Sequence, residues 1–72
     1  MYKPVNYVET GSKIHEIRLE KDLSANAVSK ECNVTVGTVY RWESGDMLPS
    51  FDSLVNLARY FEVPVEEIVQ YS

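Results

Sequence analysis

The chain has 72 residues, a net charge of −4 at pH 7 and one cysteine. This length predicts one domain, and a lone cysteine excludes an intramolecular disulfide. No apolar run approaches the ~20 residues that cross a bilayer, and the sequence has neither a signal-peptide core nor cysteine–histidine spacing typical of zinc sites. We therefore expect one globular domain with no membrane partner, held by apolar packing in a reducing, cytoplasmic setting.

The acidic charge is concentrated in the second part of the chain. Residues 1–42 hold six basic and five acidic side chains, whereas residues 43–72 hold one basic and six acidic. Nucleic-acid binding depends on the charge of the docking surface rather than on that of the whole chain. The first part is thus the better candidate for such a surface, although its positive excess is small.

Helical signals come in five blocks, and no stretch shows the alternation of a β-strand. The first block begins at Asn6, because Asn6 followed by Glu9 forms the capping-box pattern. An inward stripe at helical spacing consists of Tyr7, Gly11, Ile14, Ile17 and Arg18. Because glycine inside a helix costs roughly 1 kcal/mol relative to alanine, Gly11 predicts a close approach of another helix. This helix should end near residues 21–22.

A tight turn separates the next two helices. Ser24 is a good N-cap for the second helix, and Asn33 tolerates the left-handed conformation that closes a helix. Thr35 follows as the next N-cap. A turn of about three residues between two short helices is typical of a helix-turn-helix.

The third helix is expected to cover Val36 to about Ser44 and to end at Gly45, a natural left-handed residue. The face expected to pack inward holds Val39, Trp42 and Glu43. The residues expected to point elsewhere are Val36 (or Gly37), Tyr40 and Arg41.

Two further helices complete the pattern. Ser50 caps a fourth helix, whose apolar stripe is Phe51, Leu54, Leu57, Ala58 and Phe61. Pro64 opens a short fifth helix that contains Val65, Ile68 and Val69. We therefore predict an all-α, five-helix fold in one domain, residues 1–72, with an N-terminal arm over residues 1–5 and a helical core over residues 6–70.

With these residues in place, the chain resembles the Cro/C1-type (XRE-like) family of bacterial and phage regulators over roughly residues 7–69. The most specific matches are residues 42–45 (Trp-Glu-Ser-Gly) and 48–50 (Leu-Pro-Ser), at the family's distance after residues 23–24 (Leu-Ser). Further matches include Gly11, Ile14, Ile17, Val28, Val34, Val39, Leu54, Leu57, Phe61, Val63 and Ile68. The resemblance implies a lambda-repressor-like fold and a bacterial or phage-like protein. It also implies sequence-specific binding of double-stranded DNA and transcriptional regulation, with repression as the expected mode.

The resemblance also implies a partly buried ion pair between the first and third helices. In similar domains an arginine of the first helix pairs with a glutamate that ends the third, and these positions are Arg18 and Glu43 here. Because Arg18 shares the inward stripe with Ile14, we expect a bidentate pair that locks the two helices in register, rather than two solvated charges.

In this fold the start of the third helix enters the major groove, and the second helix lies across the DNA backbone. The candidate base-facing residues are Thr35, Val36, Gly37, Tyr40 and Arg41. The candidate phosphate contacts are Ser24, Ala25, Lys30, Thr38 and Lys13. Arg41 is the strongest candidate, because bidentate arginine–guanine contact is the commonest specific pairing. A phosphate contact and a plain solvated charge are the alternatives for Arg41.

Three departures from the family lower the expected affinity of one monomer. Ala25 stands where a glutamine is frequent, Asp46 and Met47 stand in a loop that is frequently basic, and Val36 and Gly37 replace polar residues. We therefore expect a homodimer, with its recognition helices about 34 Å apart on an inverted-repeat site. Apolar residues near the chain ends predict either a dimer surface built from the fifth helix and the arm, or packing of the arm over its own core.

Other reactive residues predict no chemistry. His15 lacks a catalytic or metal-binding set and is expected at the surface, whereas Cys32 is expected to be a small buried hydrophobic residue. We therefore expect no enzyme, no cofactor, no metal and no small-molecule ligand. Because the chain is acidic and its docking face lacks amide and basic groups typical of the family, a protein-interaction module with weak or no DNA binding is the alternative function.

Overall fold

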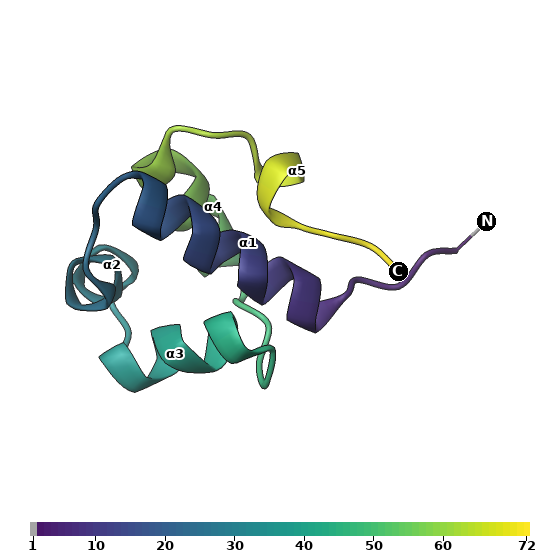
Figure 1. Cartoon of the computed structure of the whole chain (residues 1–72), viewed down its shortest axis with the longest axis horizontal. Coiled ribbons are helices and arrows are strands. Elements are labelled where there is room, and N and C mark those ends of the chain that lie inside the picture. Colours follow the sequence, from purple (N-terminus) through teal and green to yellow (C-terminus); the bar gives the residue numbers. More distant parts are fainter. Residues whose placement is uncertain (1) are drawn as a thin grey trace.

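The computed structural model describes residues 2–72, and these residues form five helices. The helices are α1 (Tyr7–Glu20), α2 (Ala25–Cys32), α3 (Val36–Ser44), α4 (Phe51–Phe61) and α5 (Val65–Ile68). In Figure 1, α1 lies across the middle of the molecule, with α3 beneath it and α2 at one end. The predicted all-α architecture is confirmed, and every helix boundary that the sequence predicts lies within about two residues of the observed one. Met1, the first residue of the predicted arm, lies outside the described residues.

Side-chain caps begin the first four helices at the predicted residues. Each cap oxygen accepts the backbone N–H three residues further along, at 2.9 to 3.2 Å. The capping residues are Asn6, Ser24, Thr35 and Ser50. The capping box predicts a second bond, from the backbone N–H of Asn6 to the side chain of Glu9. At α1 this N–H instead donates to the carbonyl of Gln70, at 2.7 Å. Local sequence thus fixes where these helices begin, and a distant segment completes the cap of α1.

The turn between α2 and α3 has the predicted three residues, 33–35. Asn33 adopts the left-handed conformation, with φ 55° and ψ 47°. The N–H of Val34 then donates to the carbonyl of Ser29 at 2.9 Å, which satisfies the end of α2. Gly45 ends α3 in the same region of backbone conformation, with φ 86°. The helix-turn-helix geometry is therefore built by residues within the unit itself.

Gly11 marks the crossing of α1 and α3. A β-carbon at Gly11 would lie 2.1 Å from the carbonyl oxygen of Trp42 and 2.9 Å from that of Glu43. These distances leave no room for any side chain, so the predicted close approach of another helix at Gly11 is confirmed. The backbone of α3 rests directly on the backbone of α1.

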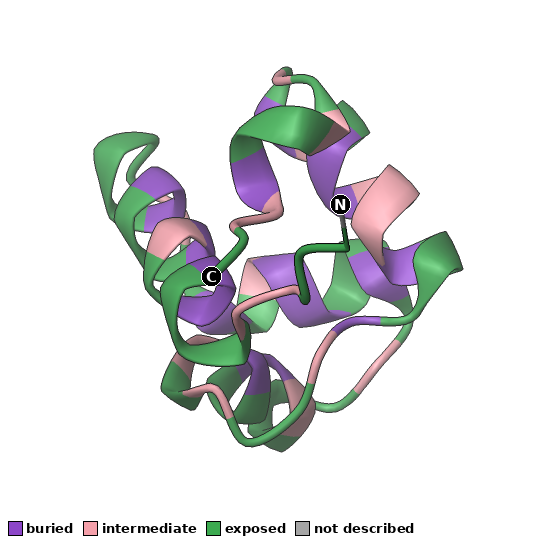
Figure 2. Cartoon of the chain, turned by 90° about the vertical axis from the view of Figure 1, so that its right-hand side faces the viewer, coloured by how far each residue is buried: buried purple, intermediate pink, exposed green. Residues whose placement is uncertain are grey.

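The core lies where the helices converge, and Figure 2 shows their buried stretches turned inward. The fully buried apolar residues are Ile14, Val28, Val39, Leu57, Phe61 and Ile68. Two predicted stripe residues are exposed instead, Tyr7 by 49% and Phe51 by 77%. Both stand first in their helix, so periodicity assigns them to the inner face, although burial begins further in, at Thr10 and Ser53.

The N-terminal arm pairs with the C-terminal tail. Val5 forms an antiparallel bridge with Tyr71, and Figure 1 shows the two chain ends side by side. The buried hydroxyl of Thr10 accepts the backbone N–H of Gln70 at 3.0 Å and holds the tail against α1. The arm thus packs against its own chain. No helix among residues 2–72 is long and apolar enough to cross a membrane.

Candidate nucleic-acid interface

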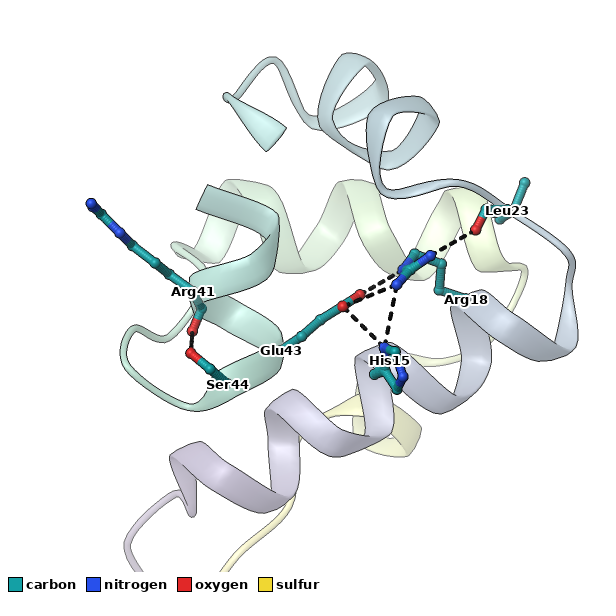
Figure 3. A network of polar contacts seen from close by, with 6 residues as sticks. All are labelled: His15, Arg18, Leu23, Arg41, Glu43 and Ser44. Atoms are coloured by element: carbon teal, nitrogen blue, oxygen red, sulfur yellow. Dashed lines mark hydrogen bonds and ion pairs between the residues drawn. The ribbon is translucent and has the colours of Figure 1, made fainter. Parts of the chain in front are cut away.

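The solvent-exposed face of α3 lies opposite the residues that anchor this helix in the core. Val39 and Trp42 are buried, and at 100° per residue Gly37 and Arg41 lie on the other side of the helix. Both are exposed, and Figure 3 shows the Arg41 side chain extending away from the fold. Arg41 has no ion-pair partner within residues 2–72, so its guanidinium is available to a ligand.

The two edges of this face have different neighbours. Val36 and Tyr40 share a helical ridge with Glu43, which contacts α1, so they lie on the α1 side. Thr38 lies on the other edge, where it lines a hollow together with Met47 and Ser50 of the loop before α4. All the predicted base-facing residues are exposed at the start or along the outer side of α3, namely Thr35, Val36, Gly37, Tyr40 and Arg41.

The predicted phosphate contacts at α2 differ in whether their side chains are exposed to solvent. Ser24 and Lys30 are exposed, and the Ser24 hydroxyl caps α2 by accepting the N–H of Ala27 at 3.0 Å. Ala25 is only 5% exposed, so its methyl group lies in the core and its backbone N–H is the group that faces the helix terminus. Around α2 the surface therefore presents helix-terminal N–H groups and one exposed lysine.

Lys13 lies on a different side of the molecule. It is two residues from Gly11, roughly 200° around α1 from the point where α1 meets α3. Its ammonium group pairs with Glu16 at 3.6 Å, in a hollow that Gln70 also lines. The structure therefore does not bring Lys13 together with the other predicted phosphate contacts.

A bidentate ion pair joins α1 to α3. The Arg18 Nε atom lies 2.6 Å from Glu43 Oε2, and Nη2 lies 3.1 Å from Oε1 (Figure 3). Nη1 of Arg18 donates to the carbonyl of Leu23 at 3.0 Å. The two charged side chains are only 10% and 8% exposed. The pair thus ties α3 both to α1 and to the segment that leads into α2.

The hydrogen bond from Arg18 to Glu43, reinforced by the charge of Glu43, raises the pKa of Arg18 above its ordinary value, against the opposing effect of burial. Arg18 therefore stays ionised at every pH at which the protein folds. The contact between α1 and α3 thus keeps its positive partner.

His15 joins this ion pair, a contact that the sequence prediction missed. Its Nδ1 atom lies 3.0 Å from Glu43 Oε1 and 3.3 Å from Arg18 Nη2, while the side chain stays 49% exposed. The residue is thus at the surface, as predicted, and also in contact with a buried pair. Its position three residues before Arg18, on the same side of α1, was the available signal.

Cys32 is buried at the end of α2, as predicted. Burial raises the pKa of its thiol, and the charge of Glu31 adds to this effect. The thiol therefore stays protonated and packs as a small hydrophobic group. No cluster of histidine, cysteine and acidic side chains within the described residues has the geometry of a metal site.

The Helix-turn-helix family model matches residues 14–68. The chain is also 33% identical, over 61 residues, to the cryptic phage CTXphi transcriptional repressor RstR of Vibrio cholerae. This match covers 85% of the chain and 55% of RstR. The curated relatives that the chain matches are longer proteins, of which it spans 30% to 55%.

Solved structures share the same architecture. The restriction-modification controller protein C.AhdI from Aeromonas hydrophila superposes with a TM-score of 0.80 at 22% identity, over 86% of this chain and 94% of C.AhdI. PlcR of Bacillus thuringiensis, solved with the peptide PapR7 and DNA, superposes with a TM-score of 0.79 at 30% identity, over 85% of this chain and 21% of PlcR. The predicted lambda-repressor-like fold is confirmed. The chain therefore belongs to the helix-turn-helix family, of the Cro/C1 type that its sequence resembles.

Proposed function

We propose that this chain binds double-stranded DNA through the exposed face of α3 and regulates transcription, with repression by occupation of promoter DNA as its mode. The observation that carries the proposal is the free guanidinium of Arg41 on a helix that buried contacts hold rigidly. Membership of a family of regulators supports this role over an enzymatic one. The name of RstR, a transcriptional repressor, and the structure of PlcR with DNA support the same function.

Arg41 is the residue proposed to read a base. Its planar guanidinium can donate two parallel hydrogen bonds to O6 and N7 of a guanine in the major groove. Because α3 is fixed to α1 at Gly11 and Glu43, the backbone at Arg41 already has a fixed position in the free protein. Little ordering of the helix is then required on binding.

The DNA backbone is proposed to contact the start of α2 and the edge of α3. The free N–H groups at the first turn of α2, including that of Ala25, attract a phosphate through the helix dipole. Lys30 adds a cation on the same helix, and Thr38 places a hydroxyl on the edge next to Met47. These contacts fix the register of the protein on DNA without reading its sequence.

Two copies are proposed to bind an inverted repeat as a homodimer through the junction of α4 and α5. This junction forms a hollow lined by Val55, Ala58, Arg59, Glu62, Val63, Pro64 and Val65. A two-fold interface brings the same patch of both copies together. The opposite charges of Arg59 and Glu62 on the rim then complement each other across the axis, while the apolar lining is buried between them.

Replacing Arg41 with alanine is expected to lower the affinity for the preferred DNA site by about 10- to 100-fold, since one bidentate base contact is worth roughly 1–3 kcal/mol. The preferred site is first enriched from fragmented genomic DNA of the source organism by the wild-type protein at about 100 mM salt, because salt strongly controls such binding. Affinities are then measured by fluorescence anisotropy, together with the circular dichroism spectrum, which should not change. Lys13→Ala, which removes a cation on a different side of the molecule, is the matched control and should bind as the wild type does.

Equal binding by the wild type and Arg41→Ala would remove Arg41 from the base readout. A folded wild-type protein that enriches no duplex would contradict DNA binding altogether. That outcome would favour the protein-interaction alternative at the same face of α2 and α3.

Charge reversal at the α4–α5 junction is expected to weaken the dimer. Arg59→Glu would place like charges on both sides of the two-fold axis, and we expect the dimer dissociation constant to rise about 10-fold, as like-charge contacts at interfaces are costly. The double variant Arg59→Glu/Glu62→Arg restores opposite charges and should restore the dimer. Analytical ultracentrifugation with and without DNA measures both, and an association state unaffected by Arg59→Glu would exclude this surface.

A further inference from the structure

The first turn of α3 offers DNA bases an almost entirely apolar surface. Val36 is 39% exposed and carries only an apolar side chain, and Gly37 has no side chain. The hydroxyl oxygens of Thr35 and Thr38 lie 2.9 Å apart, and that of Thr35 also accepts the N–H of Thr38 at 3.2 Å. Because the two hydroxyls bond to each other, only one hydroxyl hydrogen is left to donate outward. No amide, guanidinium or carboxylate stands in this turn.

Gly37 is not required by the fold. A β-carbon at this position would meet only the Thr35 hydroxyl oxygen, at 3.9 Å, and would otherwise point into open space. Glycine is nevertheless less stable than alanine inside a helix. At Gly11 the neighbouring backbone explains the glycine, whereas at Gly37 no protein atom does. The glycine at position 37 is explained if a ligand comes into close contact with the backbone of α3 there.

The major groove contains one apolar group that matches such a surface. Every base presents hydrogen-bond donors or acceptors at its major-groove edge, and thymine alone adds a C5 methyl group. A surface with almost no side-chain partners satisfies the polar edges of neither a G·C pair nor a T·A pair, so hydrogen bonds in this turn do not discriminate between them. The methyl group of thymine has no hydrogen bonds to lose when it packs against Val36, and its removal from water lowers the free energy.

The distance to Arg41 sets the spacing of the site. Gly37 and Arg41 are four residues apart, which is about 6 Å along a helix axis. Base pairs are stacked about 3.4 Å apart, so a helix in the major groove brings these two residues to neighbouring base pairs, at most about two steps apart.

Resting on the DNA binding proposed above, we infer that α3 selects half-sites in which a thymine methyl packs against Val36 and the backbone of Gly37, with a guanine at most about two base pairs away that pairs with Arg41. The ligand of the first turn is thus the methyl-bearing edge of a T·A pair. A polar base edge is read only in the second turn.

Replacing single thymines by uracils tests this inference, because the exchange removes the C5 methyl and leaves the hydrogen-bonding groups unchanged. On duplexes selected by the wild-type protein, uracil at the predicted position should weaken binding about 3- to 5-fold, as expected for one buried methyl group. Uracil outside the half-sites is the control and should have no effect. For Val36→Ala, the thymine and uracil duplexes should bind within 2-fold of each other.

Gly37→Ala provides a second test that a loss of folding cannot mimic. We expect its melting temperature to rise by about 3 to 6 °C, while its affinity for the selected duplex falls at least 10-fold because the new methyl group meets the base pairs. Ser12→Ala, an exposed change on α1 that also favours helix, should raise the melting temperature without affecting DNA binding.

Equal affinity for thymine and uracil duplexes at every half-site position would overturn the inference, as would wild-type affinity of Gly37→Ala. In both cases DNA binding itself would stand, since the duplexes were selected by the wild-type protein. Failure of the folded wild type to select any duplex would instead overturn both the inference and the proposed function.

Discussion

Replacing Gly11 with alanine is expected to destabilise the protein by about 3 kcal/mol or more, at the upper end of what overpacking costs. A β-carbon there would lie 2.1 Å from the Trp42 carbonyl oxygen, and backbone cannot rotate away as a flexible side chain can. α3 would have to move more than about 1 Å from α1 to reach an ordinary contact distance. For a domain of this size we expect the melting temperature to fall by about 12 to 24 °C, which thermal circular dichroism measures.

Gly37→Ala is the matched control for this change. Both glycines are helical, and alanine raises helix propensity equally at the two positions, by roughly 1 kcal/mol. Only at Gly11 does neighbouring backbone oppose the new methyl group, so the two variants should shift the melting temperature in opposite directions. A Gly11→Ala protein as stable as the wild type would show that α1 and α3 are not in direct backbone contact.

Replacing Glu43 with alanine is expected to cost about 3 kcal/mol, because it leaves the guanidinium of Arg18 nearly buried without its carboxylate. Only the hydrogen bond to the carbonyl of Leu23 and the contact with His15 would remain. We expect a fall in melting temperature of about 12 °C or more. DNA binding should weaken as well, since the pair orients α3 on the rest of the fold.

Two comparisons separate the buried pair from general effects of charge. Glu20→Ala removes an exposed carboxylate of α1 and should change the melting temperature little. The double variant Arg18→Met/Glu43→Leu replaces both partners by apolar groups and should recover much of the stability lost in Glu43→Ala, as other buried pairs do. An unchanged melting curve for Glu43→Ala would mean that the pair contributes little to folding.

The stability and the proposed function of this protein depend on the same contacts. α3 has two turns and a half of helix, and isolated helices this short are not stable in water. Gly11 and the Arg18–Glu43 pair hold its inner side, which leaves Arg41 and the apolar first turn on the outer side. Substitutions on the inner side should therefore weaken both folding and DNA binding, whereas those on the outer side should weaken DNA binding without destabilising the fold.

The sequence by itself determined the features that arise within a few residues. The caps at Ser24, Thr35 and Ser50, and the left-handed Asn33 and Gly45, were predicted because a cap bonds to an N–H three residues away and a turn depends on its own backbone angles. The outer face of α3 followed from helical periodicity once Val39 and Trp42 were assigned to the core.

The tertiary structure alone decided what depends on residues far apart in the chain. It brought His15 to Glu43, 28 residues away, and joined Val5 to Tyr71. It exposed Phe51, because periodicity gives the direction of a side chain but not whether another element covers it. It also turned Lys13 away from α3, since the sign of a charge says nothing about which face of the folded molecule presents it.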